Sequence, residues 1–232
     1  MTSESPSQTE PWVAKHGMKY AYAYDKGSAL FRGVGATGYP SAVLVDAKGT
    51  IVYAGHPASI NDGVIEKALD GALSKPIFEW PKELGGVAKL IRKGDLGAAV
   101  AEVQKLGEAH ADIAKAVQGM VAGRVTALEK ARDAGDWLAV ETSGKALLKG
   151  LGKLPEAEQV KAILDALDKD KGAQEILKAQ EKIAKIFAGE LKKNQFDKVQ
   201  KDLDKIREDL PGTAAARDAL AGLEKLKALR AR

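Results

Sequence analysis

The pattern of hydrophobic and polar residues changes character near residue 76 of the chain. Before this point short β-branched runs alternate with Gly and Pro, and after it come long segments rich in Ala, Leu, Lys and Glu. Short runs bounded by turn residues are typical of strands, whereas hydrophobic residues that recur every three or four positions predict amphipathic helices. The pattern therefore predicts a mixed α/β region at residues 1–75, a linker at 76–81 (PIFEWP) and an all-helical region at 82–232.

The strongest strand signal lies at residues 35–55, which read GATGYPSAVLVDAKGTIVYAG. Two apolar runs, 41–45 and 50–54, flank the turn DAKG, in which Gly49 supplies the positive φ, and this arrangement predicts a β-hairpin. The other elements expected before residue 76 are a helix from a Thr9 N-cap to Gly17, an alternating strand at 20–25, a helical turn at 28–35, and a helix capped by Asn61 or Asp62 with the apolar stripe Val64, Ile65, Ala68, Leu69 and Leu73.

The helical region contains three segments with the same spacing of hydrophobic residues. In each, a turn precedes positions at offsets 0, 3, 7 and 10, which lie on one face of a helix. Asp95 and Asp136 occupy N-cap positions directly after a Gly that can end the preceding helix. The spacing between the turns is irregular, so the region resembles tetratricopeptide-like helical hairpins only loosely. The matching positions are Leu96, Ala99, Val103 and Leu106; Trp137, Val140, Gly144 and Leu147; and Phe196, Val199, Leu203 and Ile206, and the last helix is expected to bury Leu220, Leu223, Leu226 and Leu229.

The distribution of charge predicts neither a nucleic-acid nor a membrane partner. The 232 residues include 36 Lys and Arg and 32 Asp and Glu, a net charge of +4, and the two signs are mixed along segments such as 181–209. Such mixing is typical of a solvated helix surface, whereas nucleic-acid-binding proteins concentrate positive charge on one face. No apolar run approaches the ~20 residues that span a bilayer, and the first residues carry no signal-peptide pattern.

Few side chains offer catalytic or metal-binding chemistry. The chain contains no Cys, which excludes a disulfide, a thiolate nucleophile or a thiolate-bound metal within it. Its three histidines, His16, His56 and His110, lie far apart and lack the spacing of a zinc site. Asp25 and Asp46 end predicted strands, where Asp commonly forms turns. We therefore expect no catalytic residue, no metal and no cofactor.

Four short pieces of residues 1–75 match a known family in their order along the chain: Tyr20–Asp25, Gly38-Tyr39-Pro40, Leu44-Val45-Asp46 with Gly49, and Val52–Gly55. Over roughly residues 2–75 the chain resembles the later part of the thioredoxin-like domain in the TlpA-like/redoxin branch of the thioredoxin superfamily. The resemblance implies an α/β plus all-α chain, in which an incomplete thioredoxin-like domain precedes an α-helical hairpin array. It also implies that Pro40 is the cis-proline of that fold, and that Tyr39 and Pro40 lie beside the substrate peptide. A trans Pro40 that begins an edge strand is the alternative.

The same resemblance implies that part of the family's domain is missing from this chain. Family members begin with a strand, a helix that carries a CxxC motif, and a second strand ending in a sequence such as VTSES, whereas this chain starts with MTSES. We therefore expect the middle of the sheet to be vacant beside Val43, Leu44 and Val45, an apolar edge that invites pairing. Another polypeptide, a rearrangement of residues 1–75, or contact with the helical array would cover it. A fragment of a longer thiol–disulfide protein and a degenerate domain retained for binding both fit this truncation.

Two hypotheses for function follow from these observations. The resemblance implies the thiol–disulfide oxidoreductase family, although a chain without a thiolate is expected to be inactive alone. The alternative is a non-enzymatic scaffold that binds other proteins. In either case we expect protein partners at the helical array and at the open sheet edge. The sequence leaves the oligomeric state and the compartment open, although members of the family are often extracytoplasmic in bacteria.

Overall fold

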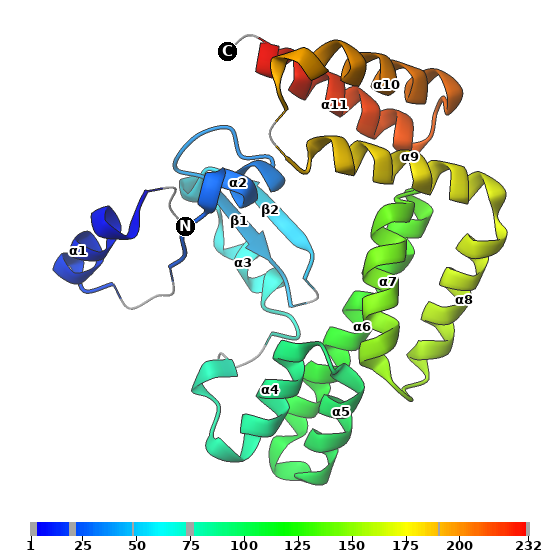
Figure 1. The fold of residues 1–232 in the computed structure, drawn as a ribbon. Coiled ribbons are helices and arrows are strands. Elements are labelled where there is room, and N and C mark those ends of the chain that lie inside the picture. The colour runs from blue at the N-terminus through cyan, green and yellow to red at the C-terminus, as the bar shows by residue number, and fades with distance from the viewer. Residues whose placement is uncertain (1–3, 19–21, 48, 73–76, 190, 231–232) are drawn as a thin grey trace. The chain divides into compact units, whose positions relative to one another are not determined.

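The computed structural model describes residues 4–18, 22–47, 49–72, 77–189 and 191–230. The chain divides into two compact units, Met1–Ala72 and Leu73–Arg232. The described part is mostly helical, with eleven α-helices and a two-stranded antiparallel sheet in the first unit (Figure 1). A small sheet before residue 76 and helices after it agree with the expected fold class at this coarse level. The assignment of the first unit to the thioredoxin-like fold stays a prediction.

The first unit contains three short helices and one hairpin: α1 (Pro6–His16), α2 (Ala29–Gly33), β1 (Ala42–Val45), β2 (Ile51–Gly55) and α3 (Asp62–Ala68). The predicted hairpin is confirmed, because β1 pairs antiparallel with β2 and Leu44 lies opposite Tyr53. Its turn forms as expected, since Gly49 has a φ of 82° and the Asp46 carboxylate accepts a hydrogen bond of 2.8 Å from the Thr50 amide. The local sequence therefore specifies the turn and the pairing of the two strands.

The start predicted for the first helix is wrong. Helix α1 begins at Pro6 rather than after Thr9, because Ser5 is its N-cap and the Ser5 amide donates a 3.0 Å hydrogen bond to Gln8 Oε1. Ser-Pro-x-Gln combines a capping box with a proline in the first turn, a stronger start signal than Thr9. Thr9 instead lies buried inside the helix. The predicted end is confirmed, since Gly17 follows His16 in the left-handed conformation.

The strand predicted at 20–25 does not form in its described part. Residues 20 and 21 lie outside the described residues, and of 22–25 only Tyr24 makes a single bridge. The alternation of apolar residues is compatible with a strand, but a strand also needs a neighbouring strand to which its backbone can hydrogen-bond. The stripe predicted for α3 is also wrong in part, because the helix ends at Ala68 and Leu69 is 61% exposed. Leu73, the last residue of that stripe, lies outside the described residues.

The second unit consists of helices packed on their sequence neighbours: α4 (Gly85–Lys93), α5 (Leu96–Lys105), α6 (Ala111–Asp133), α7 (Trp137–Leu151), α8 (Glu156–Lys169), α9 (Lys171–Phe187), α10 (Phe196–Asp209) and α11 (Ala214–Arg230). Short 3₁₀ turns at Ile77–Glu79 and Lys82–Leu84 precede them, and Trp80 packs against the helical core. No described helix is both long and apolar enough to cross a membrane.

The three predicted helix starts are confirmed. Helices α5, α7 and α10 begin at Leu96, Trp137 and Phe196, the first position of each matching segment. Their offset positions are mostly buried, and Leu106 and Trp137 are partly buried. The Asp136 carboxylate accepts a 3.1 Å hydrogen bond from the Ala139 amide, whereas Asp95 occupies the N-cap position without such a bond. A repeated apolar spacing therefore identified the core face of these helices.

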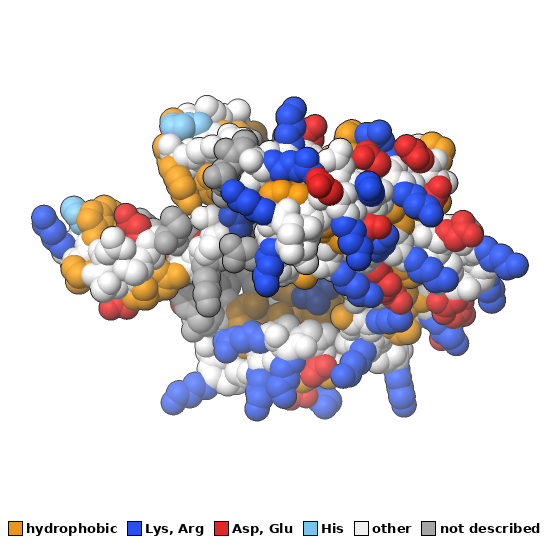
Figure 2. Space-filling view, turned by 45° about the horizontal axis from the view of Figure 1, so that its top comes forward, with side chains coloured by type: hydrophobic (Ala, Val, Ile, Leu, Met, Phe, Trp, Pro, Cys, Tyr) orange, Lys and Arg blue, Asp and Glu red, His pale blue; other side chains and the backbone are white. Residues whose placement is uncertain are grey.

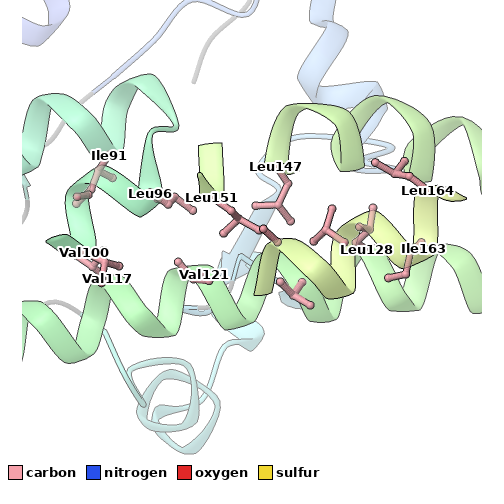
Figure 3. Close-up of a cluster of buried hydrophobic side chains, with 14 of the residues drawn as sticks. Ile91, Leu96, Val100, Val117, Val121, Leu128, Leu147, Leu151, Ile163 and Leu164 are labelled. Carbon is pink, nitrogen blue, oxygen red and sulfur yellow. The ribbon is translucent and has the colours of Figure 1, made fainter. Parts of the chain in front are cut away.

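Two clusters of buried hydrophobic side chains stabilise the helical unit. The larger one takes side chains from α4 to α9, and Figure 3 shows Leu96, Leu147 and Leu151 lying together within it. The smaller one lies between the end of α9, α10 and α11. Helix α9 joins them, because Leu177 belongs to the first and Ile183 to the second.

The face predicted for the last helix is confirmed at Leu223, Leu226 and Leu229, which are buried or packed against the core, and is wrong at Leu220. Leu226 is buried as expected, but Leu220 is half-exposed, and Ala215 and Ala219 are fully buried in its place. Helix α11 packs closely on its neighbours, since a Cβ added at Gly222 would meet the side chains of Phe187 and Leu203. The core face of α11 therefore combines leucines with small residues, and the small residues occupy its first turns.

Candidate functional site

The loop of Tyr39 and Pro40 lies directly before β1. The Tyr39–Pro40 peptide bond is cis, which confirms the expectation drawn from the resemblance, and a trans Pro40 is wrong. The Ser41 hydroxyl donates a hydrogen bond to the Gly38 carbonyl and closes the loop on itself. The Tyr39 side chain is 65% exposed. Pro40 is exposed as well, so the structure places both expected binding residues at the surface, directly before a strand.

Asp25 positions the aromatic ring behind Tyr39. Its carboxylate accepts hydrogen bonds from the amides of Leu30 (3.0 Å) and Phe31 (2.8 Å), the first residues of α2 without helical partners. These amide bonds hold the pKa of the Asp25 carboxyl below its ordinary value, although burial acts in the opposite direction. The Phe31 ring stacks on that of Tyr39 with 4.5 Å between ring centroids. Asp25 therefore organises the loop behind Tyr39.

The other polar residues considered from the sequence make local contacts. Asp46 bonds within the hairpin turn, and His56 Nδ1 accepts a 3.2 Å hydrogen bond from the Ala58 amide. The rings of Trp12 and His16 lie 4.3 Å apart on α1. Within the described ranges, no three His, Asp or Glu side chains are grouped as metal ligands. Tyr22 and Tyr24 pack edge to face, and Tyr20 lies outside the described residues.

Most of the exposed large hydrophobic side chains belong to the first unit. Among the described residues they are Trp12, Tyr22, Tyr24, Leu30, Tyr39, Val45, Ile51, Val52, Ile65 and Leu69, against Leu220 alone in the second unit. Within the described part, β1 pairs with β2 only, so its other edge is open. Along that edge Val43 and Leu44 are half-buried and Val45 is 51% exposed. The open edge expected at Val43–Val45 is thus apolar and accessible at its end.

A second candidate site, which the sequence did not reveal, lies within the helical unit. A groove of about 1000 Å³ runs between the turn that joins α4 to α5, α6 and α7. Four cationic side chains line it, Arg92, Lys93, Arg124 and Lys149, together with one carboxylate, that of Asp95. We call this site the basic groove. Elsewhere the charges are balanced, and Figure 2 shows acidic and basic side chains intermixed over much of the visible surface.

Two glycines bring the walls of the basic groove together. A Cβ at Gly150 of α7 would overlap the Gly94 carbonyl, and a Cβ at Gly97 of α5 would overlap the Leu151 carbonyl. This backbone contact places the turn at Lys93–Asp95 against the last turn of α7. The sequence signal was present, since Gly inside a helix disfavours the helix unless close packing requires it. The sequence alone does not reveal which backbone segment such a glycine approaches.

Comparison with known proteins gives no relative from which to transfer a function. No protein-family model, no curated protein and no solved structure matches this chain. The function must therefore be argued from the Tyr39–Pro40 loop, the hairpin and the basic groove themselves.

Proposed function

We propose that the Met1–Ala72 unit is an incomplete thioredoxin-like domain that binds a polypeptide at Tyr39–Pro40 and along the open edge of β1. The helical unit is then its scaffold. The observation that supports this proposal is the exposed Tyr39, directly before a strand whose second edge has no partner among the described residues.

The energetics of the hairpin support a bound polypeptide. A two-stranded hairpin is marginally stable in water unless a further strand or a helix buries one of its faces. Helix α3 contacts both strands, but among the described residues of the unit Ala68 is the one buried hydrophobic side chain. A third strand along β1 would satisfy its free backbone groups and cover Val45, which is the binding mode called β-augmentation.

The bound polypeptide would have to supply any redox chemistry. Thiol–disulfide exchange requires a thiolate to attack a disulfide sulfur, form a mixed disulfide and release the second sulfur as a thiolate. This chain has no Cys, so both sulfurs of the resting site must come from the partner segment. The proposed part of Tyr39 and Pro40 is to hold the peptide substrate beside that segment.

Fragment complementation tests this proposal. The full chain is mixed with a recombinant βαβ segment of a TlpA-like protein that carries its Trp-Cys-x-x-Cys motif. We expect binding in isothermal titration calorimetry, and faster reduction of insulin disulfides than with the segment alone. Val45→Lys should abolish binding by placing a charge at the open edge, whereas Leu220→Lys, an equally exposed leucine of the helical unit, should not. No heat of binding, or equal binding by Val45→Lys, would contradict the proposal.

The absence of Cys favours a second candidate, a purely non-enzymatic binding protein. The same experiment separates the two. Binding that depends on Val45 without any gain in insulin reduction would support the scaffold and exclude the redox role.

A further inference from the structure

We propose that the basic groove of the helical unit binds an acidic peptide segment of a partner protein, at a site independent of the Tyr39–Pro40 loop. The inference rests on four cationic side chains that line one groove, together with the small side chains at its base. All of them belong to one compact unit.

The four cations of the basic groove have no neutralising partner. Over the described ranges, the side chains of Arg92, Lys93, Arg124 and Lys149 make no ion pair, and Asp95 is the one carboxylate that lines the groove. Some cations elsewhere in the described part form ion pairs, as Arg132 does with Asp133 at 2.8 Å and Lys145 with Glu141 at 2.7 Å. Like charges gathered along a concave surface raise the local concentration of anionic groups. The charge of the groove therefore selects an acidic ligand.

Helix-end electrostatics explains only part of this cluster. Lys and Arg are favoured in the last turn of a helix, where they offset its dipole, and this accounts for Arg92 and Lys93 of α4 and for Lys149 of α7. Arg124 lies in the middle of α6, where no such effect operates. Its neighbours on the same helix face, Ala127, Leu128 and Ala131, also line the groove. The helix dipole therefore accounts for the other three cations but not for Arg124.

The floor of the groove suits a peptide better than a nucleic acid. Its exposed parts are small side chains of α6 and α7, including Ala127, Ser143 and Ala146, with Leu128 and Leu147 buried beneath them. Figure 3 shows Leu128 and Leu147 in the underlying core. Methyl groups offer an apolar contact for the side chains of an amphipathic segment. Single-stranded nucleic acids are held by stacking on aromatic rings, and no aromatic residue lines the basic groove.

Fluorescence anisotropy with a labelled peptide tests the proposal on the full chain. The probe is an amphipathic peptide of Glu, Leu and Ala, and its counterpart has Lys in place of every Glu. We expect the acidic probe alone to bind, and its affinity to fall with added salt. Arg124→Glu should weaken binding about tenfold, the usual effect of losing one charge-assisted contact. Ser143→Trp, which fills the exposed floor, should weaken it as well.

A matched control separates the groove from the net charge of the protein. Lys115→Glu changes the charge by the same amount on α6, about two and a half turns earlier and so on the opposite side of the helix. It should leave the affinity unchanged, and circular dichroism should show the same helicity in every variant. Equal weakening by Lys115→Glu and Arg124→Glu would overturn the proposal.

Other occupants of the groove give distinct results. Tighter binding of a labelled oligothymidine than of the acidic peptide, lost on Arg124→Glu, would assign the groove to nucleic acid and overturn the proposal. If sedimentation velocity shows a dimer that Arg124→Glu abolishes, the groove binds a second copy of this chain. This result would also overturn the proposal. A failure of Val45→Lys to affect peptide binding is expected, since the two sites are independent.

Discussion

The two units of this chain are stabilised by different kinds of interaction. In the helical unit, leucine, valine and alanine side chains form two buried clusters, and Leu220 is the one large hydrophobic residue left exposed among its described residues. In the Met1–Ala72 unit, Ala68 alone is a buried hydrophobic residue of the described part, and the elements are ordered by turns and caps such as those of Asp25 and Asn61. Because burial of apolar surface is the dominant favourable term in folding, we expect the first unit alone to be less stable than the helical unit.

The largest effect should appear when the units are separated. Residues 77–232 expressed alone should be helical and should unfold in one cooperative thermal transition, since both hydrophobic clusters lie within them. Residues 1–76 alone should show no such transition and should bind a hydrophobic dye. Circular dichroism and two-dimensional NMR measure both properties. A well-dispersed NMR spectrum from the isolated first unit would contradict the comparison, because it would show a self-sufficient core.

A single methyl group should weaken the second unit. Gly150→Ala places a Cβ against the Gly94 carbonyl, and since backbone rather than a flexible side chain opposes it, the turn between α4 and α5 must move away from α7. We expect a loss of about 3 kcal/mol in the free energy of unfolding by urea, the upper range for overpacking. Gly119→Ala is the matched control inside α6, where an added Cβ meets nothing within 4 Å.

The control should change stability in the opposite direction. Replacing a helical Gly by Ala without a steric cost stabilises a helix by about 0.5–1 kcal/mol. Equal effects of Gly150→Ala and Gly119→Ala would show that the close contact between α7 and the turn at Gly94 does not contribute to the stability of the unit.

The sequence predicted those parts of the fold that depend on local signals. The hairpin at 42–55 combines β-branched runs with a Gly turn, and the starts of α5, α7 and α10 combine a turn with a repeated apolar spacing. Each of these signals lies within about fifteen residues, so the printed sequence contains it whole. The resemblance in addition predicted the cis peptide at Pro40.

The errors concern features that depend on distant partners. Whether residues 22–25 form a strand depends on a neighbouring strand, and the exposure of Leu220 depends on which face of α11 meets Phe187 and Leu203. The basic groove escaped notice because its cations come from three helices, and in the sequence each is surrounded by residues of mixed charge. Charge patterns along one helix do not report what the fold brings together from several.

The smallest of these effects concerns the caps that order the first unit. Because amide hydrogen bonds lower the pKa of Asp25, its carboxylate stabilises α2 above the ordinary pKa of 3.8, and this stabilisation is lost as the pH falls through the lower pKa of the folded chain. We expect the NMR amide shifts of Leu30 and Phe31 to titrate together, with a midpoint below 3.8. Asp25→Asn should remove this titration, whereas Glu66→Gln on the exposed side of α3 should preserve it. A midpoint at or above the ordinary value would show that the Asp25 cap does not order the loop behind Tyr39. The first unit would then not be ordered by caps in the way that distinguishes it from the helical unit.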